Sequence, residues 1–441
     1  MSVPLDNLYH WVEGLLPGPA VLYVFQPHGS KNISDLDWPR DYDRDTVWQY
    51  PGVILHDQEP LDWDLYNSPS LYLDSESWKV PWKYWNNSSV QEAGLQYSAN
   101  FNLKSIVIAR GSHYDKAIII HSERNSNDLA QYQQNEFCDV YYWAHAVIAR
   151  DWYRFAEHDT RLNVKQTPKN KFLIYCRDWS HRREYRLKFS EMLVENGLDR
   201  DSQTSIMHTN SEQVHFLQHE FQNPEFKLSR PELISKIPSN EYSGTASADY
   251  AYTDFISTQV SVILETLFDG SRIHLTEKTL RPIACGHPFI LAAGPGALEY
   301  LRSYGFKTFA PWIDESYDSE SNSLNRLEKI ILAMQQIQCL QGQELKIFLQ
   351  GTKHVAEFNK KHFFSQEFFD LVECELKNNL QVAYQQVKKS QGQHYLKFLQ
   401  IVKKQKLSHR IYQRQEKTQF VRQLRQSYPR DQSNPSEDLP V

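Results

Sequence analysis

The sequence has few cysteines and no long hydrophobic run. Its five cysteines are scattered and odd in number: Cys138, Cys176, Cys285, Cys339 and Cys374. This pattern excludes a disulfide framework and a zinc knuckle, and it favours a reducing compartment. No apolar stretch is long enough to span a bilayer, and the first residues lack a basic leader followed by an apolar run. We therefore expect a cytoplasmic protein without a transmembrane segment.

Several signatures of enzymes and of nucleic-acid-binding proteins are also missing. The 17 histidines include no His-Glu-Xaa-Xaa-His motif, and there is no Gly-Xaa-Ser-Xaa-Gly turn or Walker-type lysine loop. The net charge of -6 gives no general reason to bind nucleic acid. Two Asp-Xaa-Asp triplets, at residues 41–43 and 62–64, do not follow convincing strands. We therefore expect no metal and no cofactor.

The length and composition predict two globular domains. A chain of 441 residues exceeds one ordinary hydrophobic core, and its 40% hydrophobic and 23% charged residues are typical of soluble globular proteins. A polar, proline-containing patch around Pro168 is the predicted linker. We therefore predict one domain over residues 1–168 and a second over residues 169–385.

Short β-branched runs bounded by polar turns predict buried strands in both domains. In the first domain these runs are residues 20–25, 52–56, 105–109 and 117–121. In the second domain they are residues 171–177, 258–266, 272–275 and 288–293. Helical patterns are present over residues 140–157, over residues 183–198 and after the Gly-Pro-Gly at 294–296. This alternation predicts an α/β fold with two Rossmann-like β/α/β domains that face a cleft.

The end of the chain has a different composition. Between Lys388 and Arg430 there are twelve Lys or Arg residues and a single acidic residue, Glu416. Apolar positions recur there at partly helical spacing, so we predict a basic amphipathic helical extension over residues 386–428. Residues 429–441 should be disordered. The extension either packs back on the body of the protein or contacts anionic lipid at a membrane surface or a partner protein.

The stretch RIHLTEKTLRPIACGHPFILAAGPGALEYL, residues 272–301, places charged side chains between two predicted strands. We predict that a strand ends at Leu275 and that Thr276 caps a helical turn containing Glu277 and Lys278. Such a turn lies at the carboxyl edge of a parallel sheet, where ligands bind. An anion there would meet free backbone N–H groups, the positive end of the helix dipole and the Lys278 ammonium. The alternative is a surface ion pair on an ordinary first turn.

A second group of cations follows the strand predicted over residues 171–177. The segment RDWSHRREYR contains Arg177, Arg182, Arg183 and Arg186. Planar guanidinium groups suit a bidentate grip on phosphate oxygens, although arginines are also common on helix surfaces. Two cationic clusters after strands of one domain predict an anion site better than either cluster alone.

The order of these pieces carries a resemblance to a known family. RDWSHRREYR after a strand is followed by the apolar FISTQVSVILET, then by TEK at 276–278, then by a Gly-Xaa-Pro strand. In the first half, IIIHSERNS is followed by CDVYYWAHAVIARDWYRFAEHD. In patches, the chain resembles the α-1,3-fucosyltransferase family of GT-B glycosyltransferases. It departs from that family at Thr266 and Leu267, where the family has Asn-Ser, and at Arg281 and Pro282.

The resemblance implies an inverting, metal-independent transfer of a sugar from a nucleotide diphosphate donor, such as GDP-fucose, to a glycan or another hydroxyl acceptor. Lys278 with Arg183 or Arg186 would hold the diphosphate. Glu277 would meet the ribose, Glu265 would line the donor pocket, and Arg281 lies in the same donor-binding segment. The donor base, the sugar and the acceptor stay open.

Inverting displacement needs one general base and no covalent intermediate. By the resemblance, the base is Glu123, which follows the strand predicted over residues 117–121. A second candidate is Glu59, which lies with His56 and Asp57 at the end of another predicted strand; we expect acceptor-side roles for His56 and Asp57. The alternative to an enzyme is a noncatalytic binding or scaffold protein of the same architecture that uses its basic extension to contact a partner or a membrane.

Overall fold

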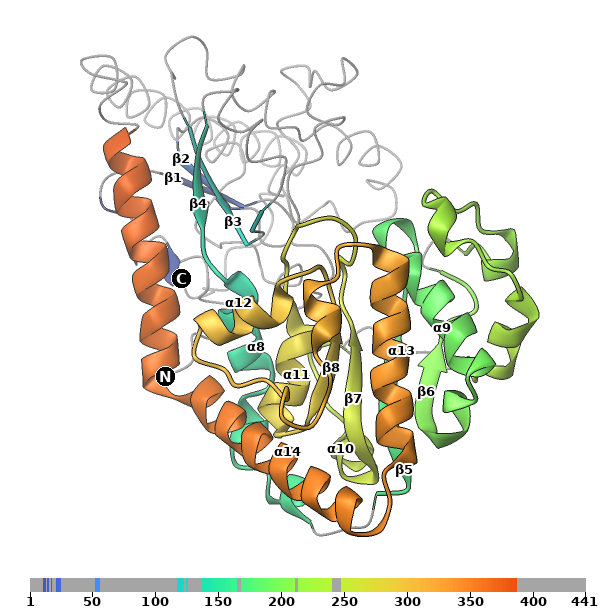
Figure 1. The fold of residues 1–441 in the computed structure, drawn as a ribbon. Coiled ribbons are helices and arrows are strands. Elements are labelled where there is room, and N and C mark those ends of the chain that lie inside the picture. The colour runs from blue at the N-terminus through green and yellow to red at the C-terminus, as the bar shows by residue number, and fades with distance from the viewer. Residues whose placement is uncertain are drawn as a thin grey trace, which may run out of the picture.

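The computed structural model describes residues 11–12, 14–15, 17, 21–24, 52–55, 117–122, 124–125, 137–164, 168–210, 213–239 and 247–386. These residues form two parallel sheets of four strands each, with helices around the second sheet (Figure 1). The predicted α/β class is therefore confirmed. The strand predicted over residues 105–109, the basic extension beyond residue 386 and the tail over residues 429–441 lie outside the described residues.

The first sheet follows the order of the sequence. Its strands are β1 (Val21–Val24), β2 (Gly52–Leu55), β3 (Ala117–His121) and β4 (Phe137–Tyr141), in the order β1-β2-β3-β4. β4 was not predicted, because FCDVY interrupts its apolar residues with Asp139 and so lacks a continuous hydrophobic run. The predicted helical pattern after it corresponds to α8 (Ala144–Trp152).

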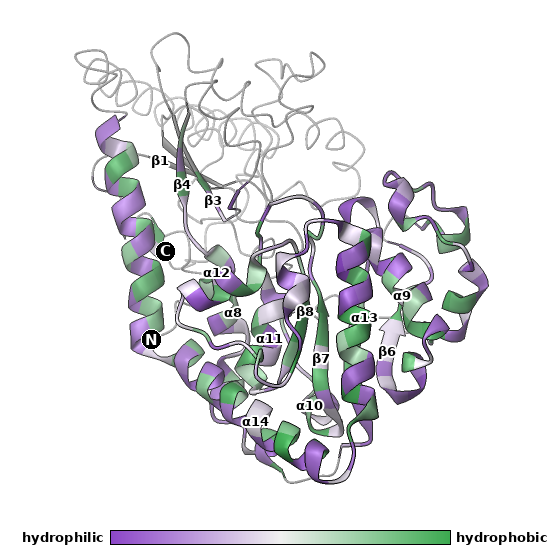
Figure 2. Ribbon diagram, viewed as in Figure 1, coloured by the Kyte–Doolittle hydropathy of each residue, from purple (hydrophilic) through white to green (hydrophobic). Residues whose placement is uncertain are grey.

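The second sheet has a different strand order. Its strands are β5 (Asn170–Cys176), β6 (Ser202–Ile206), β7 (Thr258–Leu264) and β8 (Phe289–Ala292), in the order β6-β5-β7-β8. β7 is buried along its whole length, as a strand of an enclosed parallel sheet should be, and most of its ribbon is hydrophobic in Figure 2. The polar edge strand β6 was not predicted from its sequence, SQTSI.

The prediction of a strand over residues 272–275 was wrong. Within this segment, Ile273 forms only an isolated antiparallel bridge with Arg124 of the first half. Both backbone hydrogen bonds of the bridge, Arg124 N to Ile273 O and Ile273 N to Arg124 O, are 2.9 Å long. The apolar residues of RIHL are therefore buried by contact with the first half of the chain and not by a place in the second sheet.

Helices cover both faces of the second sheet. On one face, α9 (Tyr185–Glu195) packs against α13 (Ser323–Cys339). On the other face lie α10 (Tyr252–Ser257) and α11 (Glu277–Cys285), and α8 and α14 (Gly342–Phe364) pack against α11. α12 (Ala297–Ser303) follows β8, and a last helix spans residues 366–386. The 3-10 helices are η5 (Arg154–Glu157), η6 (Thr160–Asn163), η7 (His181–Arg183), η8 (Leu198–Asp201), η9 (Phe216–Gln218), η10 (Pro224–Phe226), η11 (Pro231–Lys236) and η12 (Ser316–Ser319).

The helix over residues 366–386 returns from the second sheet to the first (Figure 1). Its Asn379 donates a hydrogen bond of 2.7 Å from Nδ2 to the carbonyl oxygen of Tyr141, at the end of β4. Its Glu375 accepts hydrogen bonds from Arg124 Nη2 at 2.7 Å and from Tyr304 Oη at 2.6 Å. The last described helix therefore joins the two halves.

Arg124 lies at the centre of this junction. Its guanidinium carbon is 4.4 Å from the ring centroid of Tyr141, 5.2 Å from that of Tyr300 and 5.7 Å from that of Tyr304. These residues come from β4 and from α12 and its end, and cation–π contacts of this kind are attractive when the cation is shielded from water. We call Arg124, Tyr141, Tyr300, Tyr304 and Glu375 the Arg124 cluster.

Gly294 is buried two residues after the end of β8, and it allows a close approach of two backbone segments. A Cβ atom at this position would lie 2.5 Å from the carbonyl oxygen of Arg272. We expect Gly294→Ala to lower the free energy of unfolding by about 2 kcal/mol, as overpacking of a close contact does. Urea unfolding followed by circular dichroism measures this loss. Gly14→Ala, whose Cβ would have no atom within 4 Å, is the control. Equal stability of the two variants would contradict the prediction.

Candidate functional site

The strand order of the second sheet indicates where a ligand can bind. β5 is flanked by β6 on one side and by β7 on the other, so the chain reverses its direction of winding between β5 and β7. In open α/β sheets, ligands bind outside the carboxyl ends of the strands at such a point. The candidate site therefore lies beyond Cys176, which ends β5, and Leu264, which ends β7.

A buried carboxylate fixes the helix that borders this site. Glu265 is fully buried directly after β7, and its two oxygens accept five hydrogen bonds. The donors are the backbone N–H groups of Thr266, Thr276 and Thr279 and the hydroxyl groups of Thr276 and Thr279, at distances of 2.5–3.2 Å. A negative charge at a helix N-terminus also favours the helix dipole. Glu265 thus holds the start of α11 against the end of β7.

Two of the backbone N–H groups that were expected to be free at the start of α11 are occupied in the structure. The N–H of Thr279 donates to Glu265, and the N–H of Lys278 donates to the hydroxyl of the N-cap residue Thr276 at 3.3 Å. Thr276 was predicted as the N-cap, and this is confirmed. Because Glu265 supplies the anion at this helix end, an external phosphate would have to be bound by side chains.

Lys278 is the side chain of α11 best placed for that role. Its side chain is 30% exposed, and its ammonium lies 2.8 Å from Glu277 Oε1, 3.2 Å from Thr276 Oγ1 and 3.4 Å from Thr266 Oγ1. Burial alone would raise the pKa of Glu277, but the adjacent ammonium lowers it below its ordinary value. Glu277 is therefore ionised at neutral pH and orients Lys278 at the carboxyl edge of the sheet.

The two predicted arginines take different positions. Arg186 is buried, and Nη2 donates to the carbonyl oxygens of Leu264 at 2.8 Å and Glu265 at 2.9 Å, while Nη1 donates to that of Asp178. It ties the ends of β5 and β7 together. Arg183 is partly exposed and pairs with the carboxylate of Asp178. Arg183 is therefore the better placed of the two to reach a bound anion.

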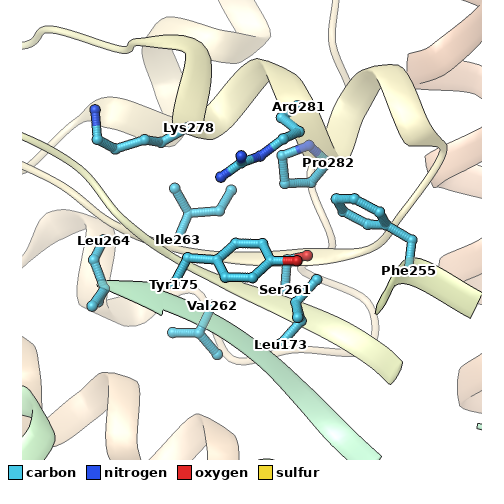
Figure 3. Close-up of a pocket in the computed structure, with 10 residues that line it drawn as sticks. All are labelled: Leu173, Tyr175, Phe255, Ser261, Val262, Ile263, Leu264, Lys278, Arg281 and Pro282. Atoms are coloured by element: carbon cyan, nitrogen blue, oxygen red, sulfur yellow. The ribbon is translucent and has the colours of Figure 1, made fainter. Parts of the chain in front are cut away.

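Arg281 lies in a pocket between α11 and the strands beneath it. Figure 3 shows Lys278, Arg281 and Pro282 on one side of this pocket and Tyr175 with residues of β7 on the other. The guanidinium carbon of Arg281 is 4.9 Å from the ring centroid of Tyr175. The pocket combines a largely apolar floor with two cationic side chains, and the Arg281 guanidinium lies against the Tyr175 ring.

The residues proposed for the first half cannot be placed directly. Glu123, Glu59, His56 and Asp57 lie outside the described residues. The neighbours of Glu123 in the sequence are described, however, and both contact the segment that leads into α11. The carbonyl oxygen of Ser122 lies 3.3 Å from His274 Nδ1, and Arg124 pairs with Ile273.

Three residues that the sequence reasoning missed also lie at or near this edge. Asp178 binds Arg183, Thr266 contacts Lys278, and His145 of α8 lies 3.9 Å from Glu277 through Nδ1. The signal for Asp178 was its place directly after the strand predicted over residues 171–177. His145 had no usable signal in the sequence. Its place shortly after a strand could not be seen, because that strand, β4, was not predicted.

The described part of the chain shows neither a cluster of metal ligands nor a membrane-spanning helix. No group of three or more His, Cys, Asp or Glu side chains there could hold a metal ion. His215 and His219 are four residues apart and next to Glu220, but the two rings have separate partners: His219 Nε2 contacts Glu184 Oε1 at 2.7 Å, and His215 Nδ1 accepts from the backbone N–H of Leu217 at 3.3 Å. Among the described helices, none has the length and apolar composition needed to cross a bilayer.

The site can thus offer an anionic ligand one partly exposed ammonium, one partly exposed guanidinium, and the hydroxyl of Thr266 at the carboxyl edge of a parallel sheet. These groups suit the binding of phosphate by charge and by hydrogen bonds. Comparison with known proteins adds no further assignment. No family model, no curated protein and no solved structure matches this chain.

Proposed function

We propose that this chain is an inverting, metal-independent glycosyltransferase of the GT-B type, which moves a sugar from a nucleotide diphosphate donor to a glycan or another hydroxyl acceptor. The observation that carries the proposal is the position of Lys278. Its ammonium lies at the carboxyl edge of the second sheet, next to the point where the strand order reverses. A nucleotide diphosphate bound at such an edge would place its phosphates there.

In the proposed complex, Lys278 and Arg183 contact the diphosphate, and Glu277 contacts the ribose. Glu265 and Arg186 do not contact the donor in this complex, because their polar groups already bind α11 and the ends of β5 and β7. We therefore assign to Glu265 and Arg186 the positioning of the donor-binding elements. The pocket that holds Arg281 borders the same helix.

The reaction requires a base from the first half. Glu123 would take the proton from the acceptor hydroxyl while the acceptor oxygen attacks the anomeric carbon of the sugar. The bond from that carbon to the diphosphate oxygen breaks, and the diphosphate leaves with the bonding electron pair. Cations fixed before the reaction stabilise this developing charge without reorganisation. The contacts of Ser122 and Arg124 with the segment before α11 support a meeting of base and donor.

Glu59 is the second candidate for the base, with His56 and Asp57 on the acceptor side. Single Glu123→Gln and Glu59→Gln variants separate the two candidates by their transfer rates. The variant that removes the base should lose most of its activity, because general-base catalysis contributes about 100- to 10,000-fold.

A thermal-shift panel tests the proposal. We expect at least one of GDP, UDP, CMP and dTDP, or the corresponding sugar nucleotide, to raise the melting temperature of the wild type, because a ligand that binds only the folded state stabilises it. The same ligand should not raise the melting temperature of Lys278→Ala. Equal shifts in both proteins would place the phosphate site elsewhere.

The panel also tests the alternative. A noncatalytic scaffold with this architecture would show no shift with any nucleotide and no hydrolysis of any sugar nucleotide. Binding of anionic lipid vesicles by the full chain, lost on removal of residues 387–441, would then support the membrane role predicted for the basic extension.

A further inference from the structure

His145 is a buried histidine without a hydrogen-bond partner. It is the second residue of α8, it is 1% exposed, and neither of its ring nitrogens has a partner. A buried polar group left unpaired costs about 1–3 kcal/mol. Such a group in a folded protein is usually explained by a bound water, an ion or a functional role.

The nearest charged group to this imidazole is Glu277, from the other half of the chain. Nδ1 of His145 lies 3.9 Å from Oε2 of Glu277, which is too long for a hydrogen bond. Oε1 of the same carboxylate is held by Lys278 at 2.8 Å. One oxygen atom placed about 2.8 Å from both Nδ1 and Oε2 would satisfy both groups.

The protonation states of the pair favour a hydroxyl group. Burial, together with the neighbouring His274, lowers the pKa of His145 to about 3, so its ring is neutral and carries one donor and one acceptor nitrogen. The carboxylate of Glu277 is ionised and only accepts. A hydroxyl can accept from the imidazole N–H and donate to the carboxylate, whereas an anion would be repelled by Glu277. The ring of His274 limits the orientation of the His145 imidazole. The centroids of the two rings are 5.1 Å apart, and the angle between their planes is 80°.

We propose that His145 and Glu277 form a hydroxyl-binding site shared by the two halves of the chain, which takes one ribose hydroxyl of the nucleotide donor. Water occupies the site in the free protein, and the ligand hydroxyl replaces it with the same hydrogen bonds. The ribose is the hydroxyl-bearing group adjacent to the diphosphate, and Glu277 is adjacent to the ammonium that would bind that diphosphate. The inference rests on the proposed function, and it adds His145, a side chain from the first half of the chain, to the residues that bind the nucleotide.

Binding of deoxynucleotides tests the inference. Titration calorimetry would compare the nucleoside diphosphate that binds in the panel with its 2′-deoxy and 3′-deoxy analogues. We expect the wild type to bind one deoxy analogue about tenfold more weakly, the loss of about one hydrogen bond. His145→Phe should discriminate less than the wild type between that analogue and the ribonucleotide, because only the hydrogen bond to Glu277 remains. His145→Gln, which keeps a polar group, should retain part of the discrimination and serves as a second variant if His145→Phe does not fold.

Two results overturn the inference while the proposed function stands. They are equal binding of ribonucleotide and deoxynucleotide by the wild type, and the same discrimination in the wild type and in His145→Phe. If no nucleoside diphosphate binds the wild type, the proposed function itself fails. High-resolution crystal structures of the free protein and of its nucleotide complex show what the site holds. A water that stays between Nδ1 and Oε2 when the nucleotide is bound, or a dry contact between these two atoms, would overturn the assignment of a ligand hydroxyl.

Discussion

Lys278→Ala should transfer sugar about 100- to 1000-fold more slowly than the wild type, the effect of removing one group that stabilises charge in a transition state. The diphosphate gains negative charge as the bond to the sugar breaks. The ammonium of Lys278, the one lysine of α11, lies close to the hydroxyl groups of both Thr266 and Thr276 beyond the end of β7. Initial rates with the donor identified in the nucleotide panel measure the effect.

Two further variants make this prediction specific. Lys346→Ala removes an exposed lysine from α14, another helix of the same half, and should leave the rate unchanged. Lys278→Arg keeps the positive charge and should recover part of the lost rate, although its planar group differs from an ammonium. A rate for Lys278→Ala close to that of the wild type would contradict the assigned role.

Glu265→Ala should lower the free energy of unfolding by about 4 kcal/mol, as the removal of one partner from a buried charged network does. The substitution removes an acceptor from five donors, of which the Thr279 N–H keeps a second acceptor in the carbonyl oxygen of Thr276, and it removes the charge that favours the start of α11. Chemical denaturation measures the loss. Glu265→Gln keeps one acceptor oxygen and should lose less stability.

The matched control for this variant is Glu328→Ala, on the exposed side of α13, which should change stability little. If Glu265→Ala and Glu328→Ala unfold at the same denaturant concentration, Glu265 does not hold α11 in place. A stable Glu265→Ala protein that loses nucleotide binding would instead assign Glu265 to the donor pocket itself.

The sequence predicted those parts of the fold that depend on local composition. β5, β7 and β8 each contain an apolar, β-forming run, and Thr276 is an N-cap because its hydroxyl accepts from the next turn, a local contact. β4 and β6 are mixed polar and apolar segments, and only their neighbours in the sheets make them strands. The bridge between Ile273 and Arg124 joins residues too distant in sequence for any local pattern to reveal it.

The candidate site was predictable in its residue types but not in its contacts. The sequence identified Lys278 and Glu277 as neighbours on a first turn, and the structure places them at the expected edge of the sheet. It did not distinguish Arg183 from Arg186, because the carbonyl groups that bind Arg186 come from β7, far away in the sequence. The pairing of His145 with Glu277 depends on the contact of α8 with α11 and has no local signal.

The helix over residues 366–386 has a consequence for any movement of the two halves. Its buried residues include Phe368, Val372, Leu376 and Leu380. Within the described residues, the chain passes from the first sheet to the second through the segment that contains α8, and it returns to the first sheet through the helix that follows Ser365. Any relative movement of the two sheets would therefore have to bend the chain at both connections. A chain truncated before Ser365 would lose one of these connections and expose the apolar surface that the helix covers.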